Sequence, residues 1–172
     1  MIGVRKIISK LMNFLPAEKY ARLIGVKVGK SCRIASRNFS GEPYLITIGN
    51  HVQICRGVSF YTHGGGHVVR RKVHDFDFFG KIKVEDWVYV GAFSHIMPGV
   101  TIGEGSIVAA GSVVTKSCPP QSVIAGNPAR IVSTIDEFIA KNEKFNVHTY
   151  GLNKKKKREL LLSLPQDKFI IK

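Results

Sequence analysis

The second half of the chain repeats an aliphatic residue every six positions. A small or short side chain lies four residues after each of these. An α-helical seam repeats on about 3.5 or 3.6 residues, so this period does not fit a helix. It predicts a solenoid of short strands and turns, in which each repeat covers its neighbour's apolar face. The aliphatic positions are Val84, Val90, Ile96, Ile102, Val108 and Val114, and the small positions are Val88, Ser94, Val100, Ser106, Ser112 and Cys118.

A nine-residue unit extends the same pattern into the first half of the chain. Its order is aliphatic, any residue, aliphatic, Gly or acid, a turn pair, a small residue, any residue and aliphatic. Alternation on both sides of a turn pair is typical of strand–turn–strand structure. We therefore predict an all-β solenoid. The unit occupies residues 26–34, 46–54, 82–90 and 100–108.

Two interruptions break the repeat, at residues 35–45 and 61–81. The second is a long loop that contains three consecutive glycines. Ile48 and Val84 stand 36 residues apart, which is six hexads, so the loop leaves the register unchanged. Long loops inside a regular scaffold are usually functional, and we expect the sites here.

The two ends of the chain predict helices. Residues 2–14 form an amphipathic pattern suited to capping the open end of a solenoid. Thr134, with Glu137 three residues later, predicts a capped helix over 134–145. A second, basic helix is expected over 153–163, followed by an added strand or a loose tail. The predicted domains are a helical cap at 1–23, a repeat body at 24–132 with the 61–81 insertion, and a basic helical tail at 133–172.

The net charge of +14 lies at the two ends. Residues 1–40 carry +8, residues 41–140 balance to zero, and residues 141–172 carry +6. Basic ends suit nucleic acid, an anionic membrane or a phosphate-rich cofactor, or they simply keep a surface solvated. We expect no nucleic acid partner, and leave open a peripheral contact with an anionic membrane through these ends.

The cysteines and the hydropathy indicate a cytoplasmic protein. Cys32 and Cys118 occupy small-residue positions of the repeat, and we interpret them as reduced core residues rather than a disulfide or metal set. No apolar run is long enough for a membrane-spanning helix, and Lys6 and Lys10 interrupt the N-terminal apolar segment in a way that argues against a signal peptide.

The segment from Val84 to Arg130 resembles the hexapeptide-repeat acyltransferases, specifically the maltose/galactoside and polysaccharide O-acetyltransferase group. The motifs that carry the resemblance are PGVTIG, AAGSVVTK and AGNPAR, and it covers about residues 24–135. It implies a left-handed parallel β-helix, a homotrimer, and acetyl-CoA bound in a groove between two subunits. It also implies O-acetylation of a sugar hydroxyl in bacterial surface polysaccharide biosynthesis. The handedness rests on the resemblance alone, because parallel crossovers are normally right-handed.

By its place after Gly57 and before the long loop, His63 matches the family's catalytic histidine. A hydroxyl acceptor needs a base to take its proton as it attacks a thioester, and histidine titrates near the working pH. His67 and His74 share the loop and are weaker candidates. His51 and His95 are expected at the surface.

Several residues are expected to orient this histidine or to bind the acceptor. Asn38 and Glu42 lie in the first interruption, where this group tends to place acceptor-binding residues, and His67 lies in the loop. A base histidine usually needs a partner that fixes its tautomer. The acids nearest the interruptions are Glu42, Asp75 and Asp77.

The resemblance also implies a set of donor contacts. A backbone N–H at Ala92 is expected to hold the oxyanion, at a point where the family often has Ser. Ala110, Thr115 and Lys116 are expected to contact acetyl-CoA, and Arg130 to bind its phosphates, since a cation suits a phosphate. Shortly after Arg130 the family has a further cationic residue, where this chain has Ser133. No metal is expected.

Three other functions remain open from the sequence. One is N-acetylation of an amino sugar nucleotide, or acetylation of serine, on the same fold. Another is a γ-carbonic-anhydrase-like zinc lyase, with His63, His67 and His95 meeting between subunits as ligands in tetrahedral geometry. The last is a β-helix that is a scaffold without catalytic activity.

Overall fold

The chain divides into two compact units, Met1–Ile135 and Asp136–Lys172. The computed structural model describes residues 14–171. The helix expected over residues 2–14 lies, apart from Phe14, outside the described residues.

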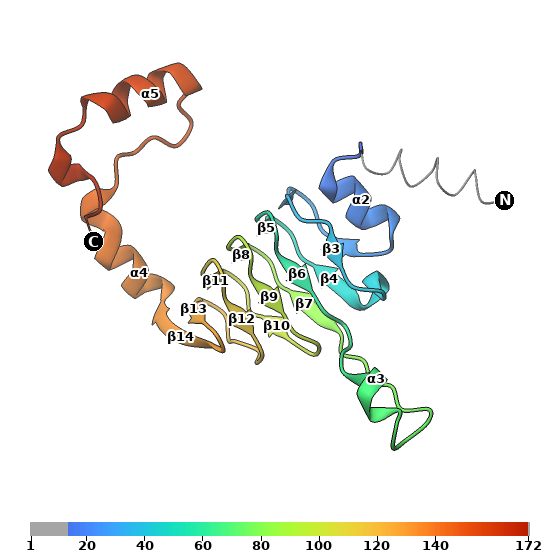
Figure 1. Ribbon diagram of the computed structural model, residues 1–172. Helices are drawn as coiled ribbons and strands as arrows, with labels where there is room; N and C mark the ends of the chain where they lie inside the picture. Colours follow the sequence, from blue (N-terminus) through green and yellow to red (C-terminus); the bar gives the residue numbers. More distant parts are fainter. Residues whose placement is uncertain (1–13, 172) are drawn as a thin grey trace. The chain divides into compact units, whose positions relative to one another are not determined.

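Short strands of the first unit form three sheets, which we name A, B and C (Figure 1). Up to residue 114 the chain visits the three sheets in turn, and successive strands of one sheet pair in parallel. Sheet A contains β1 (Lys27–Val28), β4 (Ile46–Ile48), β7 (Ile82–Val84) and β10 (Thr101–Ile102). Sheet B contains β2 (Arg33–Ile34), β5 (Gln53–Ile54), β8 (Tyr89–Val90), β11 (Ile107–Val108), β13 (Ser122–Gly126) and β14 (Ala129–Thr134). Sheet C contains β3 (Asn38–Phe39), β6 (Ser59–Phe60), β9 (His95–Ile96) and β12 (Val113–Val114).

The strand register reproduces the sequence repeat. Lys83 pairs with Thr101, and His95 pairs with Val113, so one turn of the coil takes 18 residues, or three hexads. The prediction of parallel strands coiled by a hexad repeat is confirmed. The left-handed sense of the coil stays a prediction.

The repeated aliphatic side chains form the core of the coil. Each hexad residue from Val84 to Val114 is at most 1% exposed. Burying one such side chain stabilises the fold by about 1.5–3 kcal/mol, so the repeated column is the main source of stability. Buried serines at the small positions use their hydroxyls locally: those of Ser94 and Ser112 both donate to the Ala109 carbonyl, at 3.0 and 2.7 Å.

The three cysteines are free thiols. Cys32 and Cys118 are buried in the core, which agrees with their interpretation as reduced core residues. Cys55 is half-buried, and its thiol lies 3.3 Å from the hydroxyl of Tyr89.

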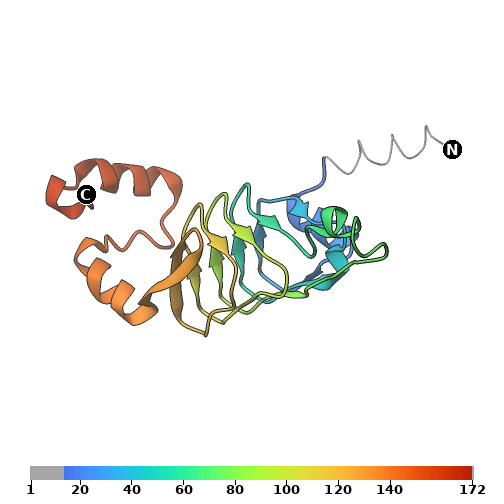
Figure 2. The same ribbon diagram turned by 60° about the horizontal axis from the view of Figure 1, so that its bottom comes forward.

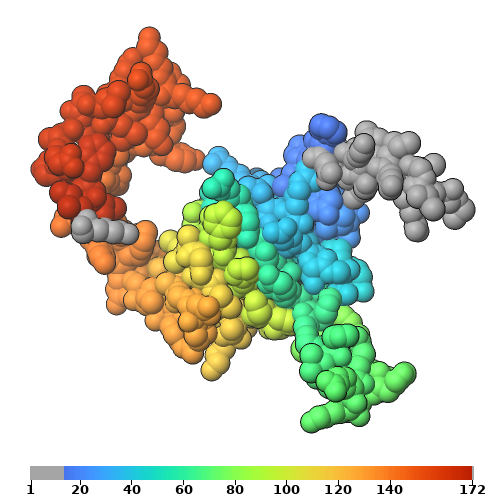
Figure 3. Space-filling model, in the orientation of Figure 1, coloured from blue at the N-terminus to red at the C-terminus, as the bar shows by residue number. Residues whose placement is uncertain are grey.

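The long loop leaves the coil without disturbing it. Ser59 before the loop pairs with His95, and Thr47 pairs with Lys83 after it. The coil reaches slightly further than predicted, because Thr62 is fully buried and the Gly80 N–H donates to its carbonyl at 2.8 Å. A side chain at Gly80 would collide with the backbone of Pro98 and Gly99. The intervening residues, with the short helix α3 (Gly66–Val69), project away from the coil (green in Figure 3).

Two different elements cover the ends of the coil (Figure 2). The helix α2 (Ala17–Leu23) packs on β1 and β2 and buries Ala21 completely. At the other end, β14 turns back antiparallel to β13. This hairpin was not predicted from the sequence.

The second unit is helical. Its first helix is α4 (Ile135–Asn142), which begins at the last residue of the first unit. The elements that follow are η2 (Glu143–Phe145), α5 (Lys154–Ser163) and η3 (Gln166–Lys168). Both predicted helices are present, and the Asn153 side chain caps α5 by accepting from the Lys156 N–H at 2.9 Å. Thr134 ends β14 and directly precedes α4. Within residues 14–171, no helix is long and apolar enough to cross a membrane.

Candidate active site

Turns between the sheets stack into edges that run along the coil. We name the edge after the strands of sheet C the C–A edge, and the edge after those of sheet B the B–C edge. Side chains on one edge come from segments that are a whole coil apart in sequence. The C–A edge carries Glu42, His63, Thr115 and Lys116, and the B–C edge carries Arg56, Ala92 and Ala110.

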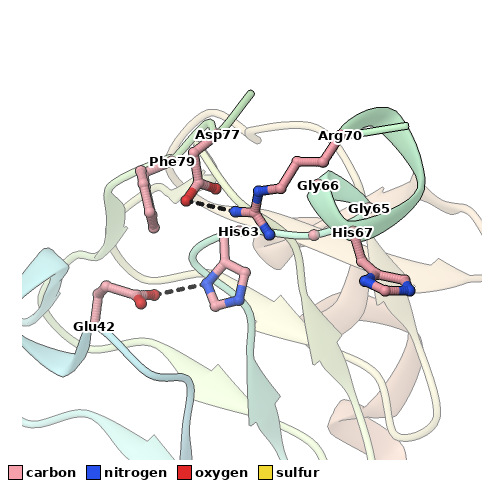
Figure 4. Close-up of a pocket in the computed structure, with 9 residues that line it drawn as sticks. Glu42, His63, Gly65, Gly66, His67, Arg70, Asp77 and Phe79 are labelled. Atoms are coloured by element: carbon pink, nitrogen blue, oxygen red, sulfur yellow. Dashed lines mark hydrogen bonds and ion pairs between the residues drawn. The ribbon is translucent and has the colours of Figure 1, made fainter. Parts of the chain in front are cut away.

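His63 and Glu42 form the central contact of the C–A edge. His63 Nδ1 lies 2.7 Å from Glu42 Oε2, and the two side chains point toward each other in Figure 4. Glu42 directly precedes η1 (Pro43–Leu45), and His63 follows β6 by three residues. An ionised carboxylate only accepts hydrogen bonds, so this distance places the proton on Nδ1 and leaves Nε2 as the basic nitrogen.

A buried hydroxyl holds Glu42 from the other side. The Thr62 hydroxyl donates to Glu42 Oε2 at 2.5 Å, and Thr62 Oγ1 is also hydrogen-bonded to Ser40 Oγ at 2.8 Å. These contacts lower the pKa of Glu42 below its ordinary value near 4.5, with the Thr62 hydrogen bond the largest cause and His63 a smaller one. Glu42 is therefore a carboxylate at neutral pH.

The His63–Glu42 pair lies at a pocket of about 310 Å³. The loop supplies the opposite wall, where Arg70 Nη2 and Asp77 Oδ2 pair at 2.9 Å. Phe79 meets the His63 ring edge-on, with ring centroids 5.7 Å apart. His67 also lines the pocket, but within residues 14–171 no hydrogen bond joins it to His63. In this pocket the exposed His63 imidazole therefore has a fixed tautomer, and it lies between apolar and charged walls.

The residues predicted to bind the acetyl donor lie on two different edges. Thr115 and Lys116 are exposed on the C–A edge, together with His63. Ala92 and Ala110 stack on the B–C edge, where the Gly111 N–H donates to the Ala92 carbonyl at 2.8 Å. Among residues 14–171, the Ala92 N–H donates no hydrogen bond. One chain therefore does not bring His63 and Ala92 together.

The remaining predicted residues lie outside the pocket. Asn38 is on the outer face of sheet C, where its side-chain amide donates to Ser59 Oγ at 3.3 Å. Arg130 is exposed on β14, and its guanidinium donates to the Ala129 carbonyl at 2.9 Å. Of the three acids proposed to orient His63, the structure brings Glu42 to it, and Asp77 pairs with Arg70 instead.

Sequence reasoning missed the groups that surround the pair. Ser40 and Thr62 were not singled out, because a hydroxyl carries no signal until the fold brings together residues that are 22 apart. Arg70 and Phe79 were treated only as loop residues. The one available signal was that Thr62 directly precedes His63.

Within a single chain, the three histidines weighed for a zinc site between subunits do not group as ligands. His95 Nδ1 lies 3.1 Å from the Tyr61 hydroxyl on sheet C. In the part of the chain that the structure describes, no three His, Cys, Asp or Glu side chains group as a metal site.

Known proteins share this coil and its repeat. The family model for the bacterial transferase hexapeptide (six repeats) matches residues 81–116. Protein CapG of Staphylococcus aureus is 42% identical over 164 residues, which cover 93% of this chain and 95% of CapG. The chain belongs to the hexapeptide-repeat acyltransferase family.

Solved structures extend the likeness to this family. A hexapeptide-repeat acetyltransferase from Vibrio cholerae O1 biovar eltor, complexed with acetyl coenzyme A, is 35% identical with a TM-score of 0.57. The match covers 64% of this chain and 60% of that one. A maltose O-acetyltransferase from Clostridium difficile 630 is 26% identical with a TM-score of 0.61, over 75% of this chain and 83% of that one. The prediction that this hexapeptide-repeat protein is an acyltransferase is thus confirmed.

The Thr62 hydroxyl controls the ionisation of Glu42, so Thr62→Val should raise the Glu42 pKa toward 4.5. The measurement is the carboxyl ¹³C shift of Glu42 as a function of pH. A lowered carboxyl pKa stabilises the fold above the unfolded value and loses this effect as the pH falls through the folded value. The stability of the wild type should therefore decline below about pH 4.5 more steeply than that of the variant.

Thr47→Val is the matched control, because Thr47 lies on sheet A and is not among the groups that shift the Glu42 pKa. It should leave the Glu42 titration unchanged. An unaltered Glu42 pKa in Thr62→Val would contradict the assignment.

Proposed function

We propose that the chain is an acetyl-CoA-dependent O-acetyltransferase that acts on a sugar hydroxyl, in the biosynthesis of a bacterial surface polysaccharide. The observation that carries the proposal is the His63–Glu42 contact of 2.7 Å at the mouth of an open pocket. The Vibrio cholerae neighbour complexed with acetyl coenzyme A supports the donor. The maltose O-acetyltransferase neighbour supports a sugar acceptor.

In this proposal the acetyl group is transferred directly, with His63 as the base. Its Nε2 takes the proton of the acceptor hydroxyl as that oxygen attacks the acetyl carbonyl carbon. The tetrahedral intermediate collapses with cleavage of the C–S bond, and His63 returns the proton to the leaving CoA thiolate. Glu42 holds the imidazole in place and stabilises the imidazolium between the two proton transfers.

The oxyanion of the intermediate needs a donor, and Ala92 supplies it in this proposal. Its N–H donates no hydrogen bond within residues 14–171. A pre-oriented N–H stabilises charge that develops in the transition state without costly reorganisation. Because Ala92 has no side-chain hydroxyl, the backbone acts alone.

The donor binds along the edges that carry small and cationic residues. Ala110 permits close approach of the pantetheine arm, while Thr115 and Lys116 contact it from the C–A edge. Arg130 binds the nucleotide phosphates as a cation. On the acceptor side, Asn38 and His67 contribute polar contacts beyond the His63–Glu42 pair.

The placement of these residues on two edges supports a homotrimer, whose coils we propose to be left-handed as the family resemblance implies. In one chain, His63 lies on the C–A edge and Ala92 on the B–C edge. A complete site forms when the C–A edge of one subunit meets the B–C edge of the next. Three such heterologous contacts close into a ring.

Removal of the base should lower turnover selectively. We expect His63→Ala to reduce kcat by about 10²- to 10⁴-fold, because general base catalysis contributes that much. Binding of acetyl-CoA should persist, measured as an unchanged rise of the melting temperature on adding the donor. Turnover is measured as CoA release with a panel of sugars.

The matched control is His74→Ala, which changes a loop histidine outside the pocket lining and should keep wild-type turnover. Full activity of His63→Ala would overturn the assignment of the base.

The shared site predicts complementation between two inactive variants. His63→Ala disables the C–A edge, and Ala110→Trp blocks the B–C edge, where Ala110 is exposed. In randomly mixed trimers, one edge of each kind remains intact in about a quarter of the sites, so co-expression should restore about a quarter of wild-type turnover. Each variant alone should stay inactive.

Co-expression of His63→Ala with Glu42→Gln is the control for this experiment. Both changes disable the same edge, so their mixture should show no recovery. Absence of recovery in the first mixture would contradict a site built from two subunits.

We also propose peripheral contact with an anionic membrane through the basic ends. The support in the second unit is the run of five cations Lys154–Arg158 at the start of α5, with Leu162 and Ile171 each 73% exposed nearby in sequence. Cations beside exposed apolar side chains suit the surface of an anionic bilayer. The basic residues before Phe14 lie outside the described residues.

Vesicle flotation tests this contact. Each cation near an anionic surface contributes about 1 kcal/mol, so Lys154→Gln with Lys155→Gln should weaken binding to phosphatidylglycerol vesicles about thirtyfold. The paired control Lys81→Gln with Lys83→Gln, in the coil, should bind as the wild type does. Equal flotation with neutral phosphatidylcholine vesicles would count against the proposal.

A further inference from the structure

A second groove lies on the B–C edge, with a volume of about 470 Å³. It extends from Ala92 toward the N-terminal coils, and Ala92 itself forms part of its lining. The predicted donor contacts Ala110 and Arg130 come later in the chain, on the other side of Ala92 along the coil. The groove is therefore open to a different ligand from the donor.

Polar side chains of two successive coils face this groove. Arg33 on β2 and Gln53 on β5 are partners in the parallel register, so their side chains project side by side from the outer face of sheet B. Neighbouring strands lie about 4.8 Å apart, which brings both side chains within reach of one small group. Arg56 follows on the edge, with its guanidinium 5.5 Å above the Phe93 ring.

The two arginines carry charge without a local counter-ion. Both are exposed, and neither forms an ion pair with a carboxylate of residues 14–171. No acidic side chain lines the groove. The lining thus provides two positive charges and no negative one.

Arginine at both sites indicates the chemistry of the ligand. A guanidinium presents a planar fork of N–H donors that matches two oxygens of a phosphate, and it remains charged at any working pH. The Gln53 amide adds a neutral donor between the charges. Two arginines match the multiple negative charge of a diphosphate better than the single charge of a carboxylate.

We propose that Arg33, Gln53 and Arg56 bind the phosphate or diphosphate of the acceptor, so that the acceptor is a phosphorylated sugar and not a neutral one. The inference rests on the proposed acetyl transfer at Ala92, and it names the substrate class of that site. The sugar lies next to Ala92, and its anionic group lies further along the groove. The apolar residues Ile34 and Ile54 line the groove beside the phosphate-binding side chains.

Titration with inorganic pyrophosphate tests the groove directly. Binding is measured by calorimetry in the presence of saturating CoA, which occupies any phosphate site of the donor. Arg33→Gln and Arg56→Gln should each weaken pyrophosphate binding by about ten- to a hundredfold, because each removes charge-assisted hydrogen bonds. Arg33→Lys should lose less than Arg33→Gln, since it keeps the charge but not the fork.

Arg71→Gln is the matched control, because it makes the same change in the exposed loop, at a residue that lines neither pocket. It should bind pyrophosphate as tightly as the wild type. Wild-type affinity in both groove variants, or loss of binding in Arg71→Gln alone, would overturn the proposal.

Two further ligands separate the sources of the diphosphate. Uridine diphosphate binding more tightly than pyrophosphate, with the same dependence on Arg33 and Arg56, supports a sugar nucleotide as acceptor. Tighter binding of a short prenyl diphosphate supports a lipid-linked sugar.

The pyrophosphate titration requires no turnover, so it is independent of the acetyltransferase assay. Loss of affinity in Arg33→Gln and Arg56→Gln supports the anion site even where no acetyl transfer is found. Normal acetylation of neutral sugars with unchanged affinity in these variants overturns the anion site and leaves the proposed function standing.

Discussion

The whole first unit depends on the pairing of each strand with the strand one coil away. A strand of two or three residues makes too few contacts to persist alone, and it gains its hydrogen bonds and its buried neighbours from the coils above and below. Inward positions must therefore hold aliphatic side chains at a fixed interval, as from Val84 to Val114, where none is more than 1% exposed. Residues at the edges do not have to be aliphatic, and the candidate site lies there.

This constraint explains what could be predicted from the sequence. The hexad period, the phase across the long loop, the buried cysteines and both C-terminal helices follow from local patterns, and the structure contains them. The motifs around Ala110 and Arg130 indicated the family to which the chain belongs. The handedness of the coil could not be derived, because an alternating pattern is the same for both hands. The hairpin of β13 and β14 was missed, because its turn residues look alike whether the chain leaves the coil or folds back on it.

The candidate site was only partly predictable for a related reason. His63 and Glu42 were chosen from the interruptions, but their contact depends on stacking segments that are 21 residues apart. The hydroxyls of Ser40 and Thr62, which complete the support of Glu42, have no periodic signature. The two arginines of the second groove were not predicted either, because Arg33 and Arg56 become neighbours of Ala92 only when three coils are aligned. Sequence patterns show which residues lie at the edges. Which of them contact each other across coils is known only from the strand register.

The loop that begins at His63 and ends before Gly80 has a consequence for variation within this architecture. Its two ends are fixed side by side by the hydrogen bond from the Gly80 N–H to the Thr62 carbonyl, at 2.8 Å. Closing a longer loop between fixed ends adds only about 0.6 kcal/mol for each doubling of its length. The pocket wall that this segment supplies can therefore change by insertion, deletion or exchange, while the coil keeps its register and loses little thermodynamic stability.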